Sequence, residues 1–298
     1  MTNGKQRIGV VGLGLMGEVL AGRLMAAGFG MLGYDIDPAK NASLVQRGGQ
    51  AATALSEVAR CDAIVLAVFS TEQVEEVVEK ELLPALGPGS GKIVLCTSTC
   101  DPDKIAALGE RIVPQGIRFL ETPVSGTSEQ VRRGEGVGMI GGDPQTAAAI
   151  APVLDAVFPR RFHIGKIGDG GRAKLAVNLI LGLNRLALAE GLVFAARLGL
   201  DPKAFLEVAR TSAAYSQVMD TKALKMIDRD FAPEGRVRQT LKDVHLMLDQ
   251  AQRLGQQLPL LNVNADVLEA CVRAGEGDRD NSAVIEEIRR RTGKRRAP

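Results

Sequence analysis

Aromatic residues are scarce in this chain, which has no tryptophan and carries aromatic side chains at 3% of its positions. Proteins that bind single-stranded nucleic acid stack the bases on aromatic side chains, so a base-stacking surface is not expected here. The net charge is also small, +2 over 298 residues, and gives no electrostatic reason for binding nucleic acid. The composition therefore argues against a nucleic-acid partner.

Cysteines and long apolar runs are rare as well. The four cysteines are Cys61, Cys96, Cys100 and Cys271, and no two have C-x-x-C spacing. We therefore expect free thiols in a reducing cytosol and no metal site. No run of about 18 apolar residues lacks a polar break, so we expect no membrane span. The glycines of "IGVVGLGLMG" are too regular for a signal peptide. A soluble, cytoplasmic protein is the prediction.

What the sequence does contain is an ordinary globular composition, with 45% hydrophobic and 24% charged residues. Its first half alternates short apolar runs with helix-length segments such as 15–27 and 72–80. The five runs typical of strands are 7–12, 31–35, 63–68, 92–96 and 118–123. This alternation predicts a parallel sheet covered by helices on both faces. A sixth run, 136–142, is expected to add an antiparallel or edge strand.

From about residue 169 the strand pattern stops, and the remaining pattern predicts helices. Their expected ranges are 169–198, 202–211, 215–228, 238–254, 259–273 and 281–291. The first of these is apolar all round, so we expect it to be buried between domains or subunits. The basic end, 289–298, is expected to be solvated and disordered, with binding to an anionic partner as the alternative.

The predicted fold class is thus α/β, with an N-terminal Rossmann-type doubly wound sheet followed by an all-α C-terminal domain. The expected divisions are 1–165 for a nucleotide-binding domain, 166–198 for a long interdomain helix and 199–298 for a helical domain. Length alone is compatible with two domains.

A glycine turn lies between the first predicted strand and the first predicted helix. Gly12, Gly14 and Gly17 have G-x-G-x-x-G spacing, which is typical of dinucleotide-binding turns in this context. The first glycine permits the tight turn, the second lets the backbone approach a pyrophosphate, and the third lets the helix pack closely on the sheet. We expect the whole turn to contact the cofactor, namely Gly12, Leu13, Gly14, Leu15, Met16 and Gly17.

Asp35 stands at the end of the second predicted strand, where a carboxylate can accept hydrogen bonds from both ribose hydroxyls. The same carboxylate would repel a 2′-phosphate, and no basic residue follows before Lys40. We therefore expect NAD as the cofactor and consider NADP less suitable. Asp37, directly before Pro38, is expected to cap a helix rather than to bind ribose.

Three further stretches carry polar residues whose roles remain open from spacing alone. Lys174 and Asn178 are four residues apart and share one face of the long apolar helix, although a surface lysine is the alternative. Ser125 and Gly126 could cradle a carboxylate or simply cap a helix. Lys242 and Asp243 form either a functional element or an exposed charged pair. His245 is expected in the core or on the surface rather than in a cleft.

These stretches resemble, in order, the motifs of the β-hydroxyacid dehydrogenase family, which includes 3-hydroxyisobutyrate dehydrogenase and tartronate semialdehyde reductase. "IGVVGLGLMG" resembles the N-terminal signature of that family, and "ETPVSGT" resembles its substrate loop D-x-P-V-S-G-G. "GDGGRAKLAVN" matches G-x-G-x-x-x-K-x-x-x-N, and "LKDVHL" matches a K-D element. The resemblance covers essentially the whole chain.

The resemblance implies an NAD(H)-dependent oxidoreductase that interconverts a short 3-hydroxy acid and its semialdehyde or oxo acid by hydride transfer. It makes Lys174 the general acid and base. The substrate, a small molecule that bears a carboxylate, is implied to lie against Ser125, Gly126, Thr127 and Asn178. Further cofactor contacts are implied for Val68, Phe69, Thr99 and Lys242. A homodimer or homotetramer is also implied.

Two departures from the family pattern concern the substrate and the cofactor loop. Thr127 stands where the second glycine of the substrate loop is usual, and Phe69 stands where proline is common. The alternatives are a 6-phosphogluconate-type dehydrogenase, for which the chain is short, and an imine reductase, which generally lacks a lysine at position 174. A non-catalytic NAD(H)-binding sensor would give Lys174, Asn178 and Ser125 no reason to occur together.

Overall fold

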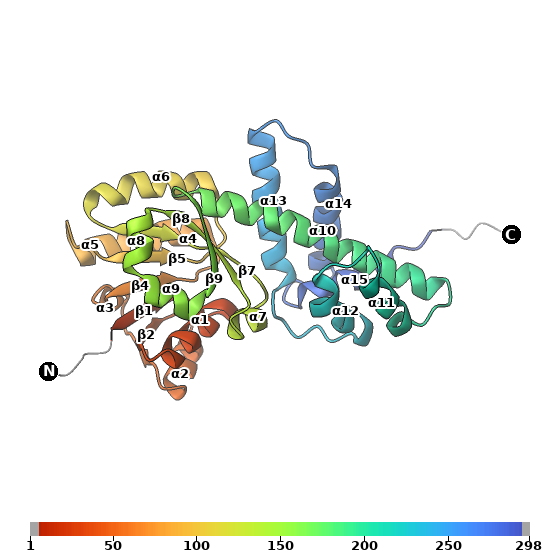
Figure 1. Cartoon of the computed structure of the whole chain (residues 1–298), viewed down its shortest axis with the longest axis horizontal. Coiled ribbons are helices and arrows are strands. Elements are labelled where there is room, and N and C mark those ends of the chain that lie inside the picture. Colours follow the sequence, from red (N-terminus) through yellow and green to blue (C-terminus); the bar gives the residue numbers. More distant parts are fainter. Residues whose placement is uncertain (1–5, 294–298) are drawn as a thin grey trace. The chain divides into compact units, whose positions relative to one another are not determined.

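The computed structural model describes residues 6–293, and the chain forms two compact units (Figure 1). Unit 1 is Met1–Lys174 and unit 2 is Leu175–Pro298. The long helix α10 (Asp169–Arg197) begins in unit 1 and ends in unit 2, so the division falls inside it, directly after Lys174. The three-part division at 165/166 and 198/199 stays a prediction.

Unit 1 is built on a nine-stranded sheet in the order β3-β2-β1-β4-β5-β6-β8-β7, with β9 paired to β8. Strands β1 to β6 run parallel, and β8 is antiparallel to β6, as expected for the sixth run. The strands are β1 (Arg7–Val11), β2 (Gly30–Tyr34), β3 (Gln50–Ala51), β4 (Ala63–Leu66), β5 (Ile93–Cys96), β6 (Arg118–Glu121), β7 (Val124–Ser125), β8 (Val137–Gly142) and β9 (Arg160–Gly165). The order 3-2-1-4-5-6 is that of a Rossmann-type sheet.

Helices cover both faces of this sheet, which explains why its central strands are continuously apolar. Successive residues of one strand enter different cores: Val65 packs with α1 and α9, whereas Ile64 packs with α4 and α6. The helical segments of unit 1 are α1 (Leu15–Ala26), α2 (Pro38–Gln46), α3 (Leu55–Val58), α4 (Thr71–Glu76), η1 (Val77–Leu82), α5 (Leu83–Leu86), α6 (Pro102–Ile112), η2 (Val113–Gln115), α7 (Ser128–Arg132), α8 (Pro144–Ala149) and α9 (Ala151–Val157).

The predictions for unit 1 missed three strands and a change of helix type. β3 and β7 are two residues long and carry no readable pattern. β9 is largely exposed, so the apolar alternation that identifies a strand is missing from its sequence. The helix expected at 72–80 begins as α4 and continues as the π-helical segment η1, which ends two residues before Pro84, a residue with no backbone N–H to donate.

Over residues 175–293 the secondary structure of unit 2 is helical, as expected, apart from an isolated β-bridge between Arg236 and Asp280, and its helices share one apolar core. Asp201 accepts a hydrogen bond from the Ala204 backbone N–H and Pro202 is the first residue of α11, so the predicted helix start is confirmed. The helices that follow α10 are α11 (Pro202–Thr211), α12 (Val218–Asp228), α13 (Val237–Arg253), α14 (Pro259–Arg273), η3 (Asn281–Ala283) and α15 (Val284–Arg290).

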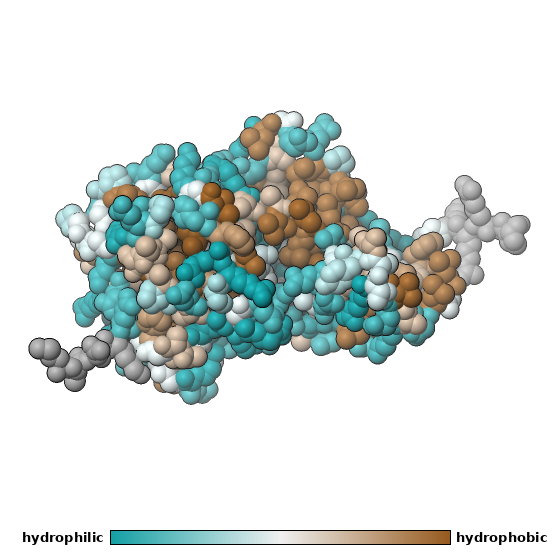
Figure 2. All heavy atoms as spheres, viewed as in Figure 1, coloured by the Kyte–Doolittle hydropathy of each residue, from teal (hydrophilic) through white to brown (hydrophobic). Residues whose placement is uncertain are grey.

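Helix α10 is long and apolar enough to span a membrane by length and composition, but it packs into the core of unit 2. Leu186, Ala189 and Leu192 are buried there. Within the single chain Ile180 and Phe194 are 61% and 66% exposed, so burial of these side chains between subunits stays a prediction. Apolar side chains accordingly reach the surface over unit 2 (Figure 2).

The first part of the basic end is ordered, which corrects the expectation of a disordered tail. Arg290 is the last residue of α15 and forms two hydrogen bonds to the Glu276 carboxylate. Arg291 pairs with Glu287 and Asp266. These arginines are therefore occupied by acidic partners of their own unit. Residues 294–298 lie outside the described residues.

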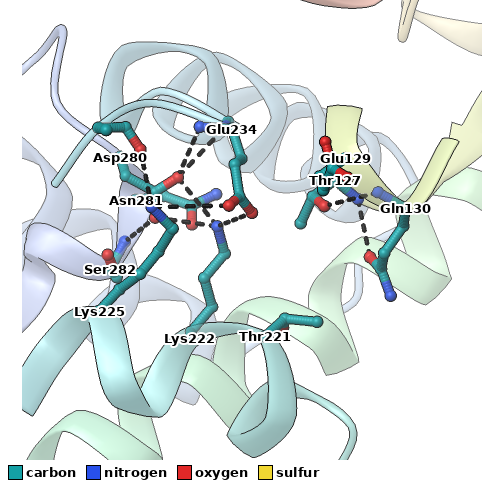
Figure 3. Close-up of polar contacts among 12 residues, drawn as sticks. Thr127, Glu129, Gln130, Thr221, Lys222, Lys225, Glu234, Asp280, Asn281 and Ser282 are labelled. Atoms are coloured by element: carbon teal, nitrogen blue, oxygen red, sulfur yellow. Dashed lines mark hydrogen bonds and ion pairs between the residues drawn. The ribbon is translucent and has the colours of Figure 1, made fainter. Parts of the chain in front are cut away.

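A buried ion pair joins α12 to the loop before η3 (Figure 3). The Lys222 ammonium lies 2.9 Å from both carboxylate oxygens of Asp280, which is fully buried. Asp280 also accepts hydrogen bonds from the backbone N–H groups of Glu234, Gly235 and Ser282. Burial alone raises the pKa of Asp280, but Lys222 and these donors outweigh it, so the net pKa lies below 3.8. The carboxylate therefore stabilises the fold above that range, and its contribution is lost in acid.

Lys222→Met should lower the free energy of unfolding by about 3–5 kcal/mol, because it leaves a buried carboxylate without its cation. The matched control is Lys203→Met, which removes an exposed pair with Asp228 and should cost less than about 1 kcal/mol. Urea unfolding followed by circular dichroism measures both. Equal midpoints for the two variants would contradict a stabilising role for the buried pair.

Candidate functional site

The glycine turn after β1 has the geometry that its sequence predicts. Gly12 has a φ of +88°, and its N–H donates to the Tyr34 carbonyl over 2.8 Å. A side chain at Gly17 would overlap the Gly12 carbonyl, so α1 reaches the turn only with glycine there. At Gly14, which directly precedes α1 and provides no side-chain cap, a Cβ would meet no atom within 4 Å. The start of this helix is thus open to a ligand.

Asp35 lies directly after β2 and contacts this turn. Its carboxylate accepts a hydrogen bond from the Leu13 N–H over 2.7 Å, and the residue is 9% exposed. Lys40 lies 3.4 Å from both carboxylate oxygens. Asp37 accepts from the Ala39 N–H at the start of α2, which confirms its predicted role as a helix cap.

The other residues expected to contact a cofactor lie in loops at the carboxyl ends of β4 and β5. The Val68 carbonyl accepts a hydrogen bond from the Ser98 hydroxyl over 2.8 Å, which joins the two loops. Phe69 is 45% exposed, and its N–H donates to Gln73 at the start of α4. Thr99 follows Ser98 directly. Because β1, β4 and β5 are adjacent and parallel, these loops and the glycine turn share one edge of the sheet.

Ser125 is the last residue of the short strand β7, and Gly126 and Thr127 lie between it and α7. Gly126 has a φ of +142°, a conformation that favours glycine. Thr127 is the N-cap of α7 and forms two hydrogen bonds with Gln130. The Thr127 hydroxyl accepts from the Gln130 backbone N–H, and the Gln130 side-chain oxygen accepts from the Thr127 backbone N–H. Helix capping thus explains the threonine that replaces the usual glycine, whereas the structure leaves the carboxylate cradle at Ser125 a prediction.

The glycine cluster at the start of α10 surrounds a buried acid that the sequence analysis did not single out. Glu121, the last residue of β6, is 3% exposed. Its carboxylate accepts hydrogen bonds from the backbone N–H groups of Gly168, Gly170 and Gly171 over 2.5, 3.0 and 3.2 Å. A Cβ at Gly170 would overlap the Met139 carbonyl. These glycines therefore allow strand β8 and the Glu121 carboxylate to lie close to the start of α10.

Lys174 lies one helical turn after this cluster and is 6% exposed. The alternative of a solvated surface lysine is thus wrong. Arg172, in the same turn, pairs with Asp103 on α6 over 2.7 Å and with Asp169 over 2.8 Å. The first turn of α10 is consequently fixed to β6 by Glu121 and to α6 by Arg172.

In unit 2, α10 and α13 bring together Asn178 and the K-D element. The Asn178 amide donates to Asp243 Oδ2 over 3.0 Å, and Lys242 Nζ lies 3.1 Å from Asp243 Oδ1. Asp243 is 8% exposed, so the exposed-pair interpretation is wrong. His245 is 52% exposed and faces Glu269, so it lies on the surface, one of the two expected places.

A buried cation extends this polar group along α10. Arg185, seven residues beyond Asn178, is 6% exposed, and no hydrogen-bond partner reaches its Nε among the described residues. Burial lowers the pKa of Arg185 to about 10, although the negative charges of Asp280 and Asp243 act to raise it. The interior of unit 2 therefore holds a polar strip along one face of an otherwise apolar helix.

Sequence reasoning missed Glu121 and the burial of Asp243. Each was within a quoted motif, "ETPVSGT" and "LKDVHL". An acid at the end of a predicted buried strand was the available signal for Glu121, because a buried carboxylate needs donors. Within residues 6–293 no group of histidine, cysteine and acidic side chains could hold a metal ion, and all four cysteines are free and buried.

The residues present in unit 1 fit a dinucleotide. The open start of α1 supplies backbone N–H groups for a pyrophosphate, and the buried carboxylate of Asp35 is placed at the end of the neighbouring strand. Lys174 adds a buried amine, a group that is chemically able to exchange a proton. A nucleotide turn and such an amine are together compatible with a dehydrogenase.

Comparisons with known proteins agree with this geometry. Residues 7–165 match the family described as the NAD binding domain of 6-phosphogluconate dehydrogenase. Residues 168–288 match that described as NAD-binding of NADP-dependent 3-hydroxyisobutyrate dehydrogenase. An L-threonate dehydrogenase from Cupriavidus necator is 30% identical over 282 residues, which is 94% of this chain and 95% of that protein.

Two further relatives cover nearly the whole chain. A 2-hydroxy-3-oxopropionate reductase from Escherichia coli is 28% identical over 95% of this chain and 97% of its own length. The crystal structure of 3-hydroxyisobutyrate dehydrogenase from Salmonella typhimurium has a TM-score of 0.85 at 30% identity, and covers 94% of this chain and 99% of that one. With a nucleotide turn, a buried lysine and both halves matched, this chain belongs to the β-hydroxyacid dehydrogenase family.

Proposed function

We propose that this chain is an NAD(H)-dependent dehydrogenase that interconverts a short 3-hydroxy acid and its semialdehyde or oxo acid. The observation that carries the proposal is the buried Lys174, held one turn beyond the Glu121 cluster at the start of α10. Relatives named for threonate, 2-hydroxy-3-oxopropionate and 3-hydroxyisobutyrate support a small substrate that bears a carboxylate.

In the proposed mechanism the chain supplies proton transfer and substrate orientation. The nicotinamide cofactor, when bound, supplies or accepts the hydride. During reduction the Lys174 ammonium donates a proton to the substrate oxygen, and its charge stabilises the negative charge that develops there. During oxidation the neutral amine accepts the hydroxyl proton. Ser125, Gly126, Thr127 and Asn178 are the proposed substrate contacts, with Asn178 oriented by Asp243.

NAD is the proposed cofactor because a carboxylate directly after the second strand, as Asp35 is, can accept hydrogen bonds from ribose hydroxyls and would repel a 2′-phosphate. Lys40 partly offsets this repulsion, since its ammonium is 3.4 Å from Asp35. The proposed contacts to the cofactor are the turn from Gly12 to Gly17, together with Asp35, Val68, Phe69, Thr99 and Lys242.

We also propose that the protein is cytoplasmic and assembles as a homodimer or homotetramer. Free cysteines support a reducing compartment. The exposed apolar residues of unit 2, including Ile180 and Phe194, support burial against another subunit.

Lys174→Ala is expected to lower kcat by about 10²-fold or more, because the reacting oxygen loses its proton donor. The Kd for NADH, measured by fluorescence titration, should stay unchanged. Lys166→Ala, which removes an exposed lysine eight residues earlier, is the control and should keep wild-type turnover. A Lys174→Ala variant with wild-type kcat would refute the role of Lys174 as the general acid and base.

Steady-state kinetics with NAD and NADP test the cofactor. The wild type should have a higher kcat/KM for NAD. Asp35→Ser should shift the ratio of the two kcat/KM values towards NADP, because the repelling charge is gone and Lys40 can then meet the phosphate. A clear NADP preference of the wild type would show that Asp35 does not select the cofactor.

A substrate panel separates an enzyme from a non-catalytic NAD(H) sensor. Purified protein is mixed with NAD and 3-hydroxyisobutyrate, 3-hydroxypropionate, glycerate, serine or threonate, and with NADH and succinic or tartronate semialdehyde. Absorbance at the NADH band should change with at least one of them. Tight NADH binding with no turnover on any of them would favour the sensor.

A further inference from the structure

Glu121 is a charged group buried in a place where an apolar residue would be expected. It is 3% exposed, and its two oxygens are directed at backbone N–H groups of Gly168, Gly170 and Gly171. The cation whose charge acts on it, Arg172, is itself bound to Asp103 and Asp169. Burying a carboxylate is costly, so this acid calls for a role beyond packing.

The surrounding backbone is shaped around this carboxylate. Gly141 is the register partner of Glu121 in the antiparallel pair, and a Cβ there would overlap Glu121 Oε1. A Cβ at Gly171 would lie 3.2 Å from Glu121 Oε2. Glycines on both β8 and α10 therefore leave room for the acid, and the three donors are fixed in place around it.

We propose that Glu121 is a positioning residue for the reaction: its carboxylate fixes the first turn of α10 so that the Lys174 amine stands where proton transfer requires it. Lys174 follows Gly171 by three residues, less than one turn of about 3.6 residues. A helix is stiff over this distance, so a shift of the glycine turn carries the amine with it. Misplacement by about 1 Å can cost about 10²-fold in rate. The proposal rests on the function proposed for Lys174.

The carboxylate is also able to titrate in the neutral range. Burial raises the pKa of Glu121 to about 7, although the three N–H donors and Arg172 act in the opposite direction. The pKa of the Cys96 thiol of β5 is raised mainly by a hydrogen bond with Cys100 and by burial, and the Glu121 charge adds a smaller contribution. Below pH 7 the carboxyl takes up a proton and accepts fewer, weaker hydrogen bonds. The hold on the first turn of α10 then loosens.

The effect on folding has the opposite sign. Because the pKa in the folded protein lies above that of an unfolded chain, the folded state holds this proton more tightly, and ionisation of Glu121 lowers stability as pH rises towards 7. A carboxylate that merely stabilised the fold would show the reverse. The ionised form is thus kept at a cost in stability, as expected for a group that serves the reaction.

The test compares Glu121→Gln and Glu121→Asp with Glu110→Gln, which changes an exposed acid on α6. The reaction is followed in the reduction direction, where Lys174 must be protonated and so limits the rate only at high pH. Wild-type kcat should fall as pH drops through about 7, and Glu110→Gln should share this limb. Glu121→Gln should lower kcat at pH 8 by about tenfold or more, leave the Kd for NADH within about twofold, and lose the acidic limb. Glu121→Asp should regain the limb.

Hydrogen exchange supplies a readout that needs no turnover. After correction for intrinsic rates, the Gly168, Gly170 and Gly171 amides of the wild type should lose protection as pH falls from 8 to 5.5, and those of Glu121→Gln should be unprotected throughout. Equal protection at both pH values, or a Glu121→Gln enzyme that keeps wild-type kcat and the limb, would overturn the proposal. A wild type without turnover on the whole substrate panel would instead refute the proposed function, and exchange alone would then decide whether Glu121 holds the turn.

Discussion

The arrangement of the candidate site depends on the three hydrogen bonds that the Glu121 carboxylate accepts from backbone N–H groups. They join the end of β6, a strand of the nucleotide-binding sheet, to the start of α10, the helix that carries Lys174. Arg172 adds a second attachment, to α6. Because both attachments lie within unit 1, they fix the first turn of α10 relative to the sheet.

Glycine has two different physical tasks in this chain. In the turn after β1, Gly12 supplies a positive φ and Gly17 removes a clash, which leaves the open start of α1 at Gly14 for a ligand. At the start of α10, Gly170 and Gly171 make room for protein atoms, a strand carbonyl and a carboxylate. Similar glycine-rich sequences therefore produce a ligand site in one place and an internal attachment in the other.

Unit 2 uses buried charge in a comparable way. Asp280 holds Lys222 and three backbone N–H groups, so its charge is fully engaged within the core. Asp243 binds Asn178 and Lys242 and thereby fixes the amide that we propose as a substrate contact. In both cases a buried acid sets the direction of a neighbouring polar side chain, because leaving it without donors would cost more than ordering them.

The sequence by itself determined the strand–helix alternation, the glycine turn with Asp35, the helical second half and the motif that carries Lys174. These features depend on hydrophobic periodicity and on turn residues, both of which are set by residues near one another in the chain. The sequence did not reveal β9, whose exposed residues lack a pattern, nor the burial of Asp243. Tertiary structure alone decided that Glu121 meets Gly168, since 47 residues separate the acid from its donor. Sequence spacing has no means of encoding such a long-range pairing, which exists only once the sheet has brought the two backbones together.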